Sequence, residues 1–281
     1  NRYTVKKWAN EFMNSLNQVH KVYHSIKAKK IEETHIDRFK DKMNSNESKL
    51  LFLDYDGTLV NFTNQPEDAK PDPELFKILE QLNSKAKTKL VIISGRDKKT
   101  LNQWFGETPY TLVSDHGVSM RLEGEQWKTM ERLKTDWMED VLPVLETFVD
   151  RTPGTLVEKK KFSLAWHYRN TDVELAQKRL VEIKTVLTSF ISNTDLTLLE
   201  GNKVIEIKSS KVNKGRACSQ LVNQFPSEHI FAFGDDWTDE FMFEELPERA
   251  ETVKIGVRKT KAKYYVNTVA DVRSLLKTMA E

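Results

Sequence analysis

The sequence lacks the features that mark secreted and membrane proteins. It has one cysteine, Cys218, so no disulfide can form within the chain, and a reducing, cytoplasmic compartment is the simplest expectation. No run of about 18 apolar residues occurs, so we expect no membrane span. No signal peptide opens the chain. The first residue is Asn1 rather than Met, which is typical of a fragment or a processed chain.

An excess of charge of one sign is also absent. The chain has 44 basic and 42 acidic residues, a net charge of +2, which gives no overall signal for nucleic-acid binding. Internal repeats and low-complexity tracts are missing as well. What remains is a chain of 281 residues, 38% of them hydrophobic, which is enough for a sizeable core and typical of about two domains.

Two kinds of hydrophobic pattern divide most of the chain. Apolar strands alternate with amphipathic helices in residues 47–124 and again in residues 208–281, which predicts a parallel sheet covered on both faces. In residues 125–207 the stretch "KKFSLAWHYRN" alternates between apolar and polar positions, and "LTLLEGNKVIEIK" is typical of a hairpin. We therefore predict an α/β fold: a doubly wound, Rossmann-like core with an inserted α+β domain.

The first residues, 1–46, are predicted to form an N-terminal helical extension. Apolar residues recur at spacings of three and four from Val5 to Ile26. His20 and His24 stand four residues apart, but no acidic or third ligand lies near them. We interpret both as surface histidines.

Two aspartates follow the first buried strand, in "LLFLDYDGTL". Asp54 and Asp56 are two residues apart and point the same way, at the strand end where doubly wound sheets bind ligands. Two carboxylates there call for a cation, and Mg²⁺ takes oxygen ligands while leaving room for phosphate. Gly57 allows a sharp turn, after which Thr58 can offer its hydroxyl and backbone N–H to an anion.

The other strand ends carry matching chemistry. Ser94, Gly95 and Arg96 follow the second core strand and can donate to a phosphate. Lys214 begins a helix, where the positive end of the helix dipole also favours an anion. The acidic turn at 235–239 follows a later strand. These four pieces stand in a fixed order, each beside a strand or helix end, and together they predict a phosphoryl-transfer site.

This order resembles the haloacid dehalogenase superfamily of phosphotransferases over residues 49–281. Within it, the strings "LDYDGTL", "SGR", "HG", "VEKKKFSLAWHYR", "EIKSSKVNKG" and "FGDDWTDEFMF" are similar to the trehalose-6-phosphate phosphatase family. The family has Glu-His-Gly where this chain has Asp115-His116-Gly117, which leaves the role of Asp115 open.

The resemblance implies a mechanism. Asp54 is the expected nucleophile, which forms an aspartyl-phosphate, and Asp56 is the expected general acid and base. Mg²⁺ is expected on Asp54, on Asp235 and on the main-chain carbonyl of Asp56. Ser94 and Lys214 are expected to bind the transferred phosphoryl group.

Two further aspartates have less definite roles. Asp239 is expected to orient Lys214 or a metal-bound water rather than to bind metal directly. Asp236 is left open between those two roles.

The inserted domain is expected to act as a cap that supplies sugar contacts. The resemblance places these contacts on Glu158, Lys160 and Glu206, with His116 and Arg121 from the edge of the core. Charged side chains bond sugar hydroxyls strongly. The charge run that begins at Glu158 is also typical of a solvated strand end, and Glu206 of an exposed strand residue.

We therefore predict a phosphatase that hydrolyses trehalose 6-phosphate. A related capped phosphatase acting on sucrose 6-phosphate or a hexose phosphate is the first alternative, because the core motifs do not separate these substrates. A non-catalytic sugar-phosphate-binding module is the second, although it would be expected to lose one aspartate of the Asp54 and Asp56 pair. "RYTVKKWANEFMNSL" resembles the closing helix of a trehalose-6-phosphate synthase domain, which implies such a domain as partner at Trp8 and Phe12.

Overall fold

The computed structural model describes residues 27–281 except 64, 131–132 and 202. The predicted helix from Val5 to Ile26 lies outside the described residues, and so do its histidine pair and the proposed contact at Trp8 and Phe12.

The chain divides into two compact units. Among the described residues, the core unit comprises those up to Lys128 together with Lys214–Glu281, and the inserted unit comprises those from Thr129 to Asn213. The sequence pattern places the inserted domain at 125–207, so the two divisions differ by a few residues at each end.

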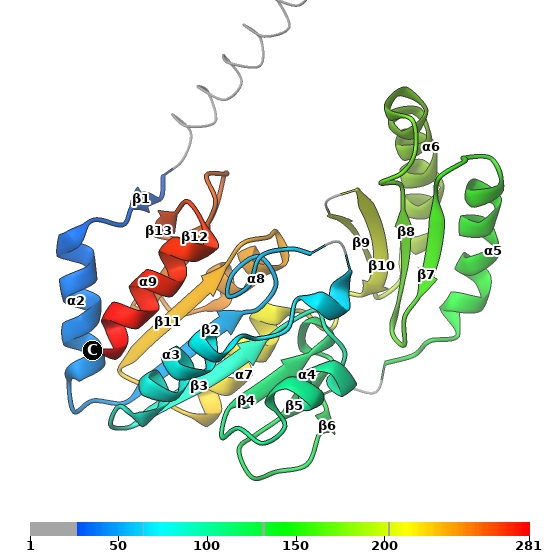
Figure 1. Cartoon of the computed structure of the whole chain (residues 1–281). Helices are drawn as coiled ribbons and strands as arrows, with labels where there is room; N and C mark the ends of the chain where they lie inside the picture. Colours follow the sequence, from blue (N-terminus) through cyan, green and yellow to red (C-terminus); the bar gives the residue numbers. More distant parts are fainter. Residues whose placement is uncertain (1–26, 64, 131–132, 202) are drawn as a thin grey trace, which may run out of the picture. The chain divides into compact units, whose positions relative to one another are not determined.

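Within the described residues, a nine-stranded sheet forms the centre of the core unit (Figure 1). In spatial order its strands are β1 (Lys29–Lys30), β13 (Tyr264–Val266), β12 (Glu251–Ile255), β11 (His229–Gly234), β2 (Lys49–Asp54), β3 (Thr88–Ile93), β4 (Thr111–Ser114), β5 (Ser119–Arg121) and β6 (Lys128–Thr129). The pairings from β1 through to β4 are parallel, and β5 pairs with β4 in the antiparallel sense.

The sheet is doubly wound, as the sequence predicts. From β2 the chain proceeds outward through β3 and β4 on one side and, later, through β11, β12 and β13 on the other. Strands β11, β2 and β3 are therefore neighbours, and their carboxyl ends lie together at the point where the winding changes direction. This is the place where such sheets bind ligands.

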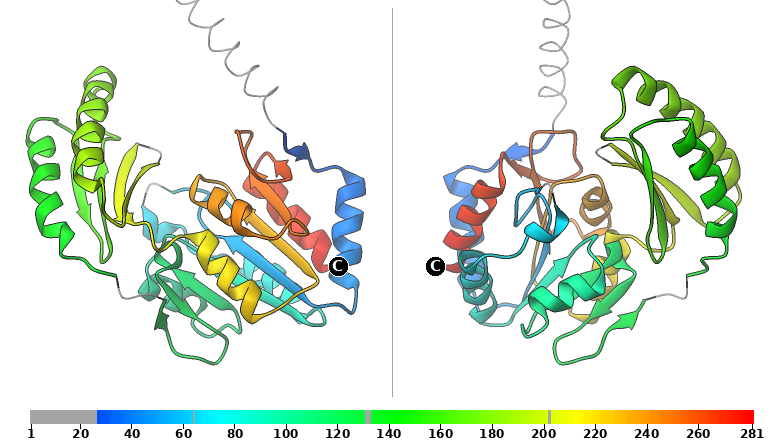
Figure 2. Two further views of the ribbon diagram at one scale, coloured as in Figure 1. Left: turned by 180° about the vertical axis from the view of Figure 1, so that it is seen from behind. Right: turned by 45° about the vertical axis from the view of Figure 1, so that its right-hand side comes forward.

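Helices cover both faces of this sheet. One face packs against α2 (Glu33–Asn44), α3 (Pro73–Ser84), α4 (Lys98–Phe105) and α9 (Val269–Ala280). Helices α7 (Lys214–Gln224) and α8 (Thr238–Glu245) contact each other, and Figure 2 shows α7 in front of the sheet in the view from behind. Strand β2 is buried along its whole length because both of its faces are covered.

Helix α2 is part of the core rather than an extension of it. Phe39 and Met43 are fully buried in the hydrophobic core of this unit. Arg38 and Lys42 bind Glu251 of β12 at 3.2 and 2.5 Å. Strand β1 also pairs with β13. The prediction of a separate extension up to residue 46 is therefore wrong for its described part.

The inserted unit has its own antiparallel sheet. In spatial order its strands are β7 (Leu156–Lys159), β8 (Ser163–His167), β10 (Val204–Ser209) and β9 (Leu196–Gly201). Helices α5 (Trp137–Asp150) and α6 (Val173–Ile191) pack on one face, where Leu164, Trp166, Ile205 and Ile207 are buried. The alternate positions belong to the opposite face, here called the polar face.

None of the helices in the described part of the chain combines the length and the apolar character needed to cross a bilayer.

Candidate active site

Asp54 stands at the carboxyl end of β2 and is almost fully buried, with 4% of its surface exposed. Its Oδ1 accepts a hydrogen bond from Lys214 Nζ at 2.6 Å. Its Oδ2 is buried and has no hydrogen-bond partner among the described residues. A buried carboxylate oxygen with no partner is costly, unless a cation or a reacting group completes the site.

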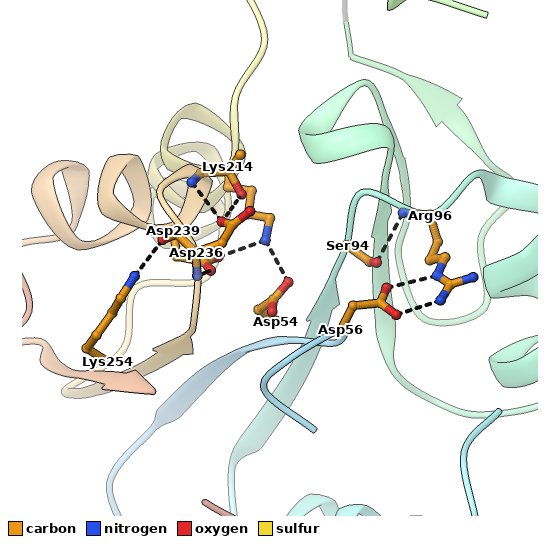
Figure 3. Close-up of polar contacts among 9 residues, drawn as sticks. Asp54, Asp56, Ser94, Arg96, Lys214, Asp236, Asp239 and Lys254 are labelled. Atoms are coloured by element: carbon orange, nitrogen blue, oxygen red, sulfur yellow. Dashed lines mark hydrogen bonds and ion pairs between the residues drawn. The ribbon is translucent and has the colours of Figure 1, made fainter. Parts of the chain in front are cut away.

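Lys214 links two acidic side chains (Figure 3). It is the first residue of α7, is 2% exposed, and donates to Asp239 Oδ1 at 2.7 Å as well as to Asp54. Asp239, on α8, is fully buried. The predicted contact between Asp239 and Lys214 is therefore present.

The site concentrates negative charge in a buried space. Burial raises the pKa of Asp54 to about 7, although Lys214 opposes the shift. Burial and the charge of Asp239 raise the pKa of Asp235 to about 7. Burial also raises the pKa of Asp239 well above its ordinary value. Burial alone would lower the pKa of Lys214. The charges of Asp239 and Asp54 outweigh this effect and raise the pKa of Lys214 well above its ordinary value.

Three carboxylates lie close enough to hold one cation. Oxygens of Asp54, Asp235 and Asp239 lie within 4.8 Å of one another. Hard divalent cations prefer such an all-oxygen set, and a cation would offset the mutual repulsion of the three carboxylates. The residues present therefore fit a divalent metal ion. This set contains Asp239, for which the sequence predicts contact with Lys214 or a metal-bound water, and it leaves out the Asp56 side chain.

Asp236 is occupied by the local fold. Its carboxylate accepts hydrogen bonds from Thr238 N at 2.7 Å and Thr238 Oγ1 at 2.6 Å, at the start of α8. Its backbone N–H donates to Asp239 Oδ2 at 3.0 Å. Asp236 thus shapes the turn that presents Asp235 and Asp239, rather than joining the carboxylate cluster.

The Asp56 carboxylate points to Arg96 (Figure 3). Arg96 Nε lies 2.8 Å from Asp56 Oδ2, and Arg96 Nη2 lies 2.6 Å from Asp56 Oδ1, a two-point ion pair. The guanidinium also lies 5.2 Å from the centre of the Trp104 ring. Arg96, expected to bind substrate, here holds the side chain expected to act as general acid and base.

The turn after β3 and the turn after β4 are joined through their backbones. His116 N–H donates to Ser94 O at 2.9 Å, and Asp115 N–H donates to Arg96 O at 2.9 Å. Asp115 and His116 both have positive φ, at 51° and 56°. A Cβ on Gly95 would lie 2.5 Å from the His116 ring, so a larger residue here would displace that ring. Ser94, Gly95 and His116 therefore lie together in one corner of the core unit.

Thr58 and Gly57 form the turn that follows Asp56. Gly57 has φ +81°, and a Cβ there would lie 2.4 Å from the Asp235 carboxylate. Thr58 is fully buried, and its Oγ1 has no hydrogen-bond partner among the described residues. The close packing of this turn against Asp235 explains why glycine is needed, and the unused hydroxyl fits an anion-binding role.

Arg121 has different partners from those predicted. Its guanidinium donates to the carbonyl oxygens of Gly106 at 2.6 Å, Phe105 at 3.1 Å and Thr108 at 3.2 Å. These carbonyls lie at and just beyond the end of α4, where helix carbonyls lack partners within the helix. Arg121 thus caps a helix end from β5, and the structure gives no support to a sugar contact there.

The polar face of the inserted unit brings together the three residues expected to bind sugar. Glu158 of β7 and Glu206 of β10 both lie opposite Ala165 of β8 in the strand register. Glu206 Oε1 lies 3.7 Å from Lys160 Nζ.

Each of the two carboxylates is held by a neighbour on β8. His167 Nε2 lies 2.9 Å from Glu158 Oε2, and Ser163 Oγ donates to Glu206 Oε1 at 2.5 Å. The hydrogen bond from His167 lowers the pKa of Glu158, so that this side chain stays ionised. Sequence reasoning overlooked His167 and Ser163, although their alternation with Leu164 and Trp166 places them on this face.

Comparison with known proteins decides the family. The trehalose-phosphatase family model matches residues 52–273, which include the core site and the polar face. The chain belongs to the trehalose-phosphatase family. A bifunctional trehalose-6-phosphate synthase/phosphatase of Thermoproteus tenax is 34% identical over 277 residues, and the trehalose-phosphatase of Saccharomyces cerevisiae is 32% identical over 266 residues.

The solved structures agree with this assignment to the trehalose-phosphatase family. The C-terminal domain of the Candida albicans trehalose-6-phosphate phosphatase superposes with a TM-score of 0.81 at 27% identity, covering 90% of this chain and 98% of that one. The alignments cover 98% and 86% of this chain for the T. tenax and S. cerevisiae relatives, but only 38% and 30% of their own lengths. The core unit therefore has a haloacid dehalogenase-type fold, into which the α+β unit is inserted.

Proposed function

We propose that the chain hydrolyses trehalose 6-phosphate to trehalose and phosphate. The observation that carries this proposal is the buried Asp54 carboxylate at the carboxyl end of β2. Its Oδ1 accepts a hydrogen bond from Lys214, and its Oδ2 has no hydrogen-bond partner among the described residues. A nucleophile needs such a free oxygen beside a group that stabilises developing charge. The substrate is proposed from the T. tenax, S. cerevisiae and C. albicans relatives, whose names give trehalose 6-phosphate or trehalose phosphatase activity.

In the proposed reaction Asp54 Oδ2 attacks phosphorus, and the sugar oxygen leaves with a proton from Asp56. Water then attacks the aspartyl-phosphate, gives a proton to Asp56, and releases phosphate and the Asp54 carboxylate. Because Arg96 binds both carboxylate oxygens of Asp56, we infer that this pair opens when substrate binds. Ser94, Thr58 and Lys214 bind the phosphoryl oxygens.

The proposed cofactor is Mg²⁺. Asp54, Asp235 and the main-chain carbonyl of Asp56 would hold it, while Asp239 remains bound to Lys214. The ion supplies positive charge that offsets the repulsion between the Asp54 carboxylate and the anionic ester.

The proposed sugar contacts are Glu158, Lys160 and Glu206 on the polar face. All three are charged, and His167 and Ser163 hold the two carboxylates in place. Sugar hydroxyls far from phosphorus are the features that distinguish a disaccharide phosphate from a hexose phosphate. His116, beside Ser94, is retained as a contact on the core side, whereas Arg121 is not.

A trehalose-6-phosphate synthase domain is the proposed partner, in the same chain or in a complex. The T. tenax relative is described as bifunctional, and the present chain spans 38% of its length.

The test is phosphate release from a panel of sugar phosphates. Trehalose 6-phosphate should be hydrolysed far faster than glucose 6-phosphate or sucrose 6-phosphate, with the Asp54→Asn variant as the blank. Equal rates on glucose 6-phosphate and trehalose 6-phosphate would favour a less selective phosphatase. No release from any member would favour a non-catalytic binding module.

A further inference from the structure

Lys254 is a buried lysine next to the acidic turn, and no step of the proposed reaction uses it. It lies on β12 with 2% of its surface exposed. In the parallel register it stands directly opposite Gly234, the residue at which β11 ends and the acidic turn begins. Its neighbours Val253 and Ile255 belong to the core on the α9 side, so the Lys254 side chain extends to the other face.

The ammonium group of Lys254 has two partners near the turn. It donates to the main-chain carbonyl of Asp236 at 2.7 Å, and it forms an ion pair with Glu240 Oε1 of α8 at 3.1 Å (Figure 3 shows the contact with the turn). A buried ammonium is costly unless such partners satisfy it. Both partners hold the Lys254 ammonium group in a defined position. Its main-chain partner, Asp236, is the residue next to Asp235.

Every polar group of Asp236 is then in use. The carboxylate accepts from Thr238 and the N–H donates to Asp239, both within the same turn and helix. The Asp236 carbonyl, by contrast, accepts a hydrogen bond from outside the turn, from Lys254 on β12. Lys254 thus ties the acidic turn to the sheet that carries Asp54.

Glu240 anchors the other side of this contact. Its Oε2 accepts from Lys261 N at 2.7 Å and from Thr260 Oγ1 at 3.1 Å, in the segment between β12 and β13. Glu240 Oε1 accepts no hydrogen bond that meets ordinary geometry, so the Lys254 charge is what compensates it.

We propose that Lys254 is a positioning residue, which holds the Asp235–Asp236 backbone so that the Asp235 carboxylate stands ready to bind a divalent cation beside Asp54. This inference rests on the proposed cation-dependent function. Charge alone would act in the opposite direction, because a lysine near the cluster repels a cation. The two effects therefore predict opposite changes when the lysine is removed.

The experiment measures Mg²⁺ binding by calorimetry, in addition to phosphate release. Lys254→Met should weaken Mg²⁺ binding about ten-fold, the size expected when one buried, charge-assisted hydrogen bond is lost. Lys254→Met/Glu240→Gln removes both charges, avoids an uncompensated Glu240, and should show the same loss. Hydrolysis by both variants should recover toward the wild-type rate at saturating Mg²⁺, which a purely structural defect would not do.

Lys49 offers a matched control. It is also buried, and it also donates to backbone carbonyls, those of Ser45, Glu47 and Ala86, but at the amino end of β2. Lys49→Met should lower the melting temperature and leave Mg²⁺ affinity unchanged.

The proposal is overturned if the Lys254 variants bind Mg²⁺ as tightly as wild type or more tightly, or if Lys49→Met weakens binding equally. It is also overturned if the wild-type protein binds no Mg²⁺. A wild-type protein that binds Mg²⁺ but does not hydrolyse trehalose 6-phosphate would contradict the proposed function alone. If Lys254→Met does not fold, the charge-neutral double variant carries the test.

Discussion

At the scale of single residues, the site places like charges together in a way that folding alone would not favour. Asp54, Asp235 and Asp239 converge in a buried space, where carboxylates repel one another and lose hydration. Lys214 compensates part of this charge through Asp54 and Asp239. Such an arrangement is typical of sites that trade stability for chemistry.

The first prediction concerns the cost of ionising Asp54. Its pKa is about 7 in the folded chain and near 3.8 in its ordinary state, so stability falls as pH rises from about 4 to 7. Asparagine does not titrate and can still accept from Lys214. Without metal at pH 8, Asp54→Asn should therefore melt at a higher temperature than wild type while losing all turnover.

Scanning calorimetry in excess chelator measures this difference. Asp41→Asn, which removes an exposed carboxylate on α2, is the control and should leave the melting temperature unchanged. A variant Asp54→Asn that melts clearly below wild type would show that the ionised carboxylate stabilises the fold.

The second prediction concerns Gly57. Gly57→Ala adds a methyl group 2.4 Å from the Asp235 carboxylate, at φ +81°. Gly124→Ala introduces the same kind of left-handed strain at φ +71°, but nothing lies within 4 Å of the added carbon. Each change should cost about 1–2 kcal/mol in backbone strain. Only Gly57→Ala should also abolish Mg²⁺ binding, as measured by calorimetry; equal binding by the two variants would contradict the assigned packing.

At the scale of elements, the sequence predicts most of the α/β core because its strands are long and apolar on both faces. The pattern predicts the strands β2, β3, β4, β11 and β12, and it predicts the helices α3, α4, α7, α8 and α9. The pattern does not predict strands β1, β5, β6 and β13, because segments of two or three residues carry no usable periodicity. Helix α2 was assigned to an extension because its burial depends on β12 and α9, which are distant in sequence.

The site residues divide in the same way. The sequence predicts Asp54, Ser94, Lys214 and the acidic turn as site residues because each follows a strand or begins a helix. The partners of Asp56, Arg121 and Lys254 depend on tertiary contacts that no local pattern reports. The resemblance names Arg121 as a sugar contact, whereas its observed hydrogen bonds go to carbonyls at the end of α4, which no motif reports.

The third prediction belongs to the sheet of the inserted unit. Glu158→Gln or His167→Ala should reduce kcat/KM for trehalose 6-phosphate about ten-fold or more, the usual effect of one lost charged hydrogen bond. Turnover of p-nitrophenyl phosphate, which has no sugar, should barely change. Steady-state kinetics on the two substrates measures the ratio.

Glu200→Gln is the matched control for this sheet. Glu200 also lies in the inserted unit, but it is paired with Lys184 of α6, on the helix side rather than the polar face. Glu200→Gln should leave kcat/KM unchanged for both substrates. If Glu158→Gln lowers kcat/KM equally for trehalose 6-phosphate and p-nitrophenyl phosphate, Glu158 serves folding and the assigned sugar contact is wrong.

At the scale of the whole molecule, we expect a cation bound by the carboxylate cluster to stabilise the folded chain. A ligand that binds only the folded chain stabilises it by about 2.7 kcal/mol when present at a hundred times its Kd. Mg²⁺ should therefore raise the melting temperature of the chelator-treated protein and restore its activity. Ca²⁺ should also raise the melting temperature but should not support turnover, because its looser coordination disturbs the in-line geometry.

Thermal melts across a Mg²⁺ titration test this coupling, with Asp235→Asn as the control that should respond weakly. Full activity in excess chelator, or a melting temperature that does not change with Mg²⁺ concentration, would contradict a metal site formed by these aspartates.

The most direct test of the account is to trap the reaction on Asp54. The protein is mixed with trehalose 6-phosphate and Mg²⁺, quenched in acid within one turnover, reduced with borohydride and digested for peptide mass spectrometry. The account predicts that Asp54, and no other residue, is converted to homoserine, which marks an aspartyl-phosphate. Release of phosphate from trehalose 6-phosphate with Asp54 unmodified, or with another residue labelled, would contradict it.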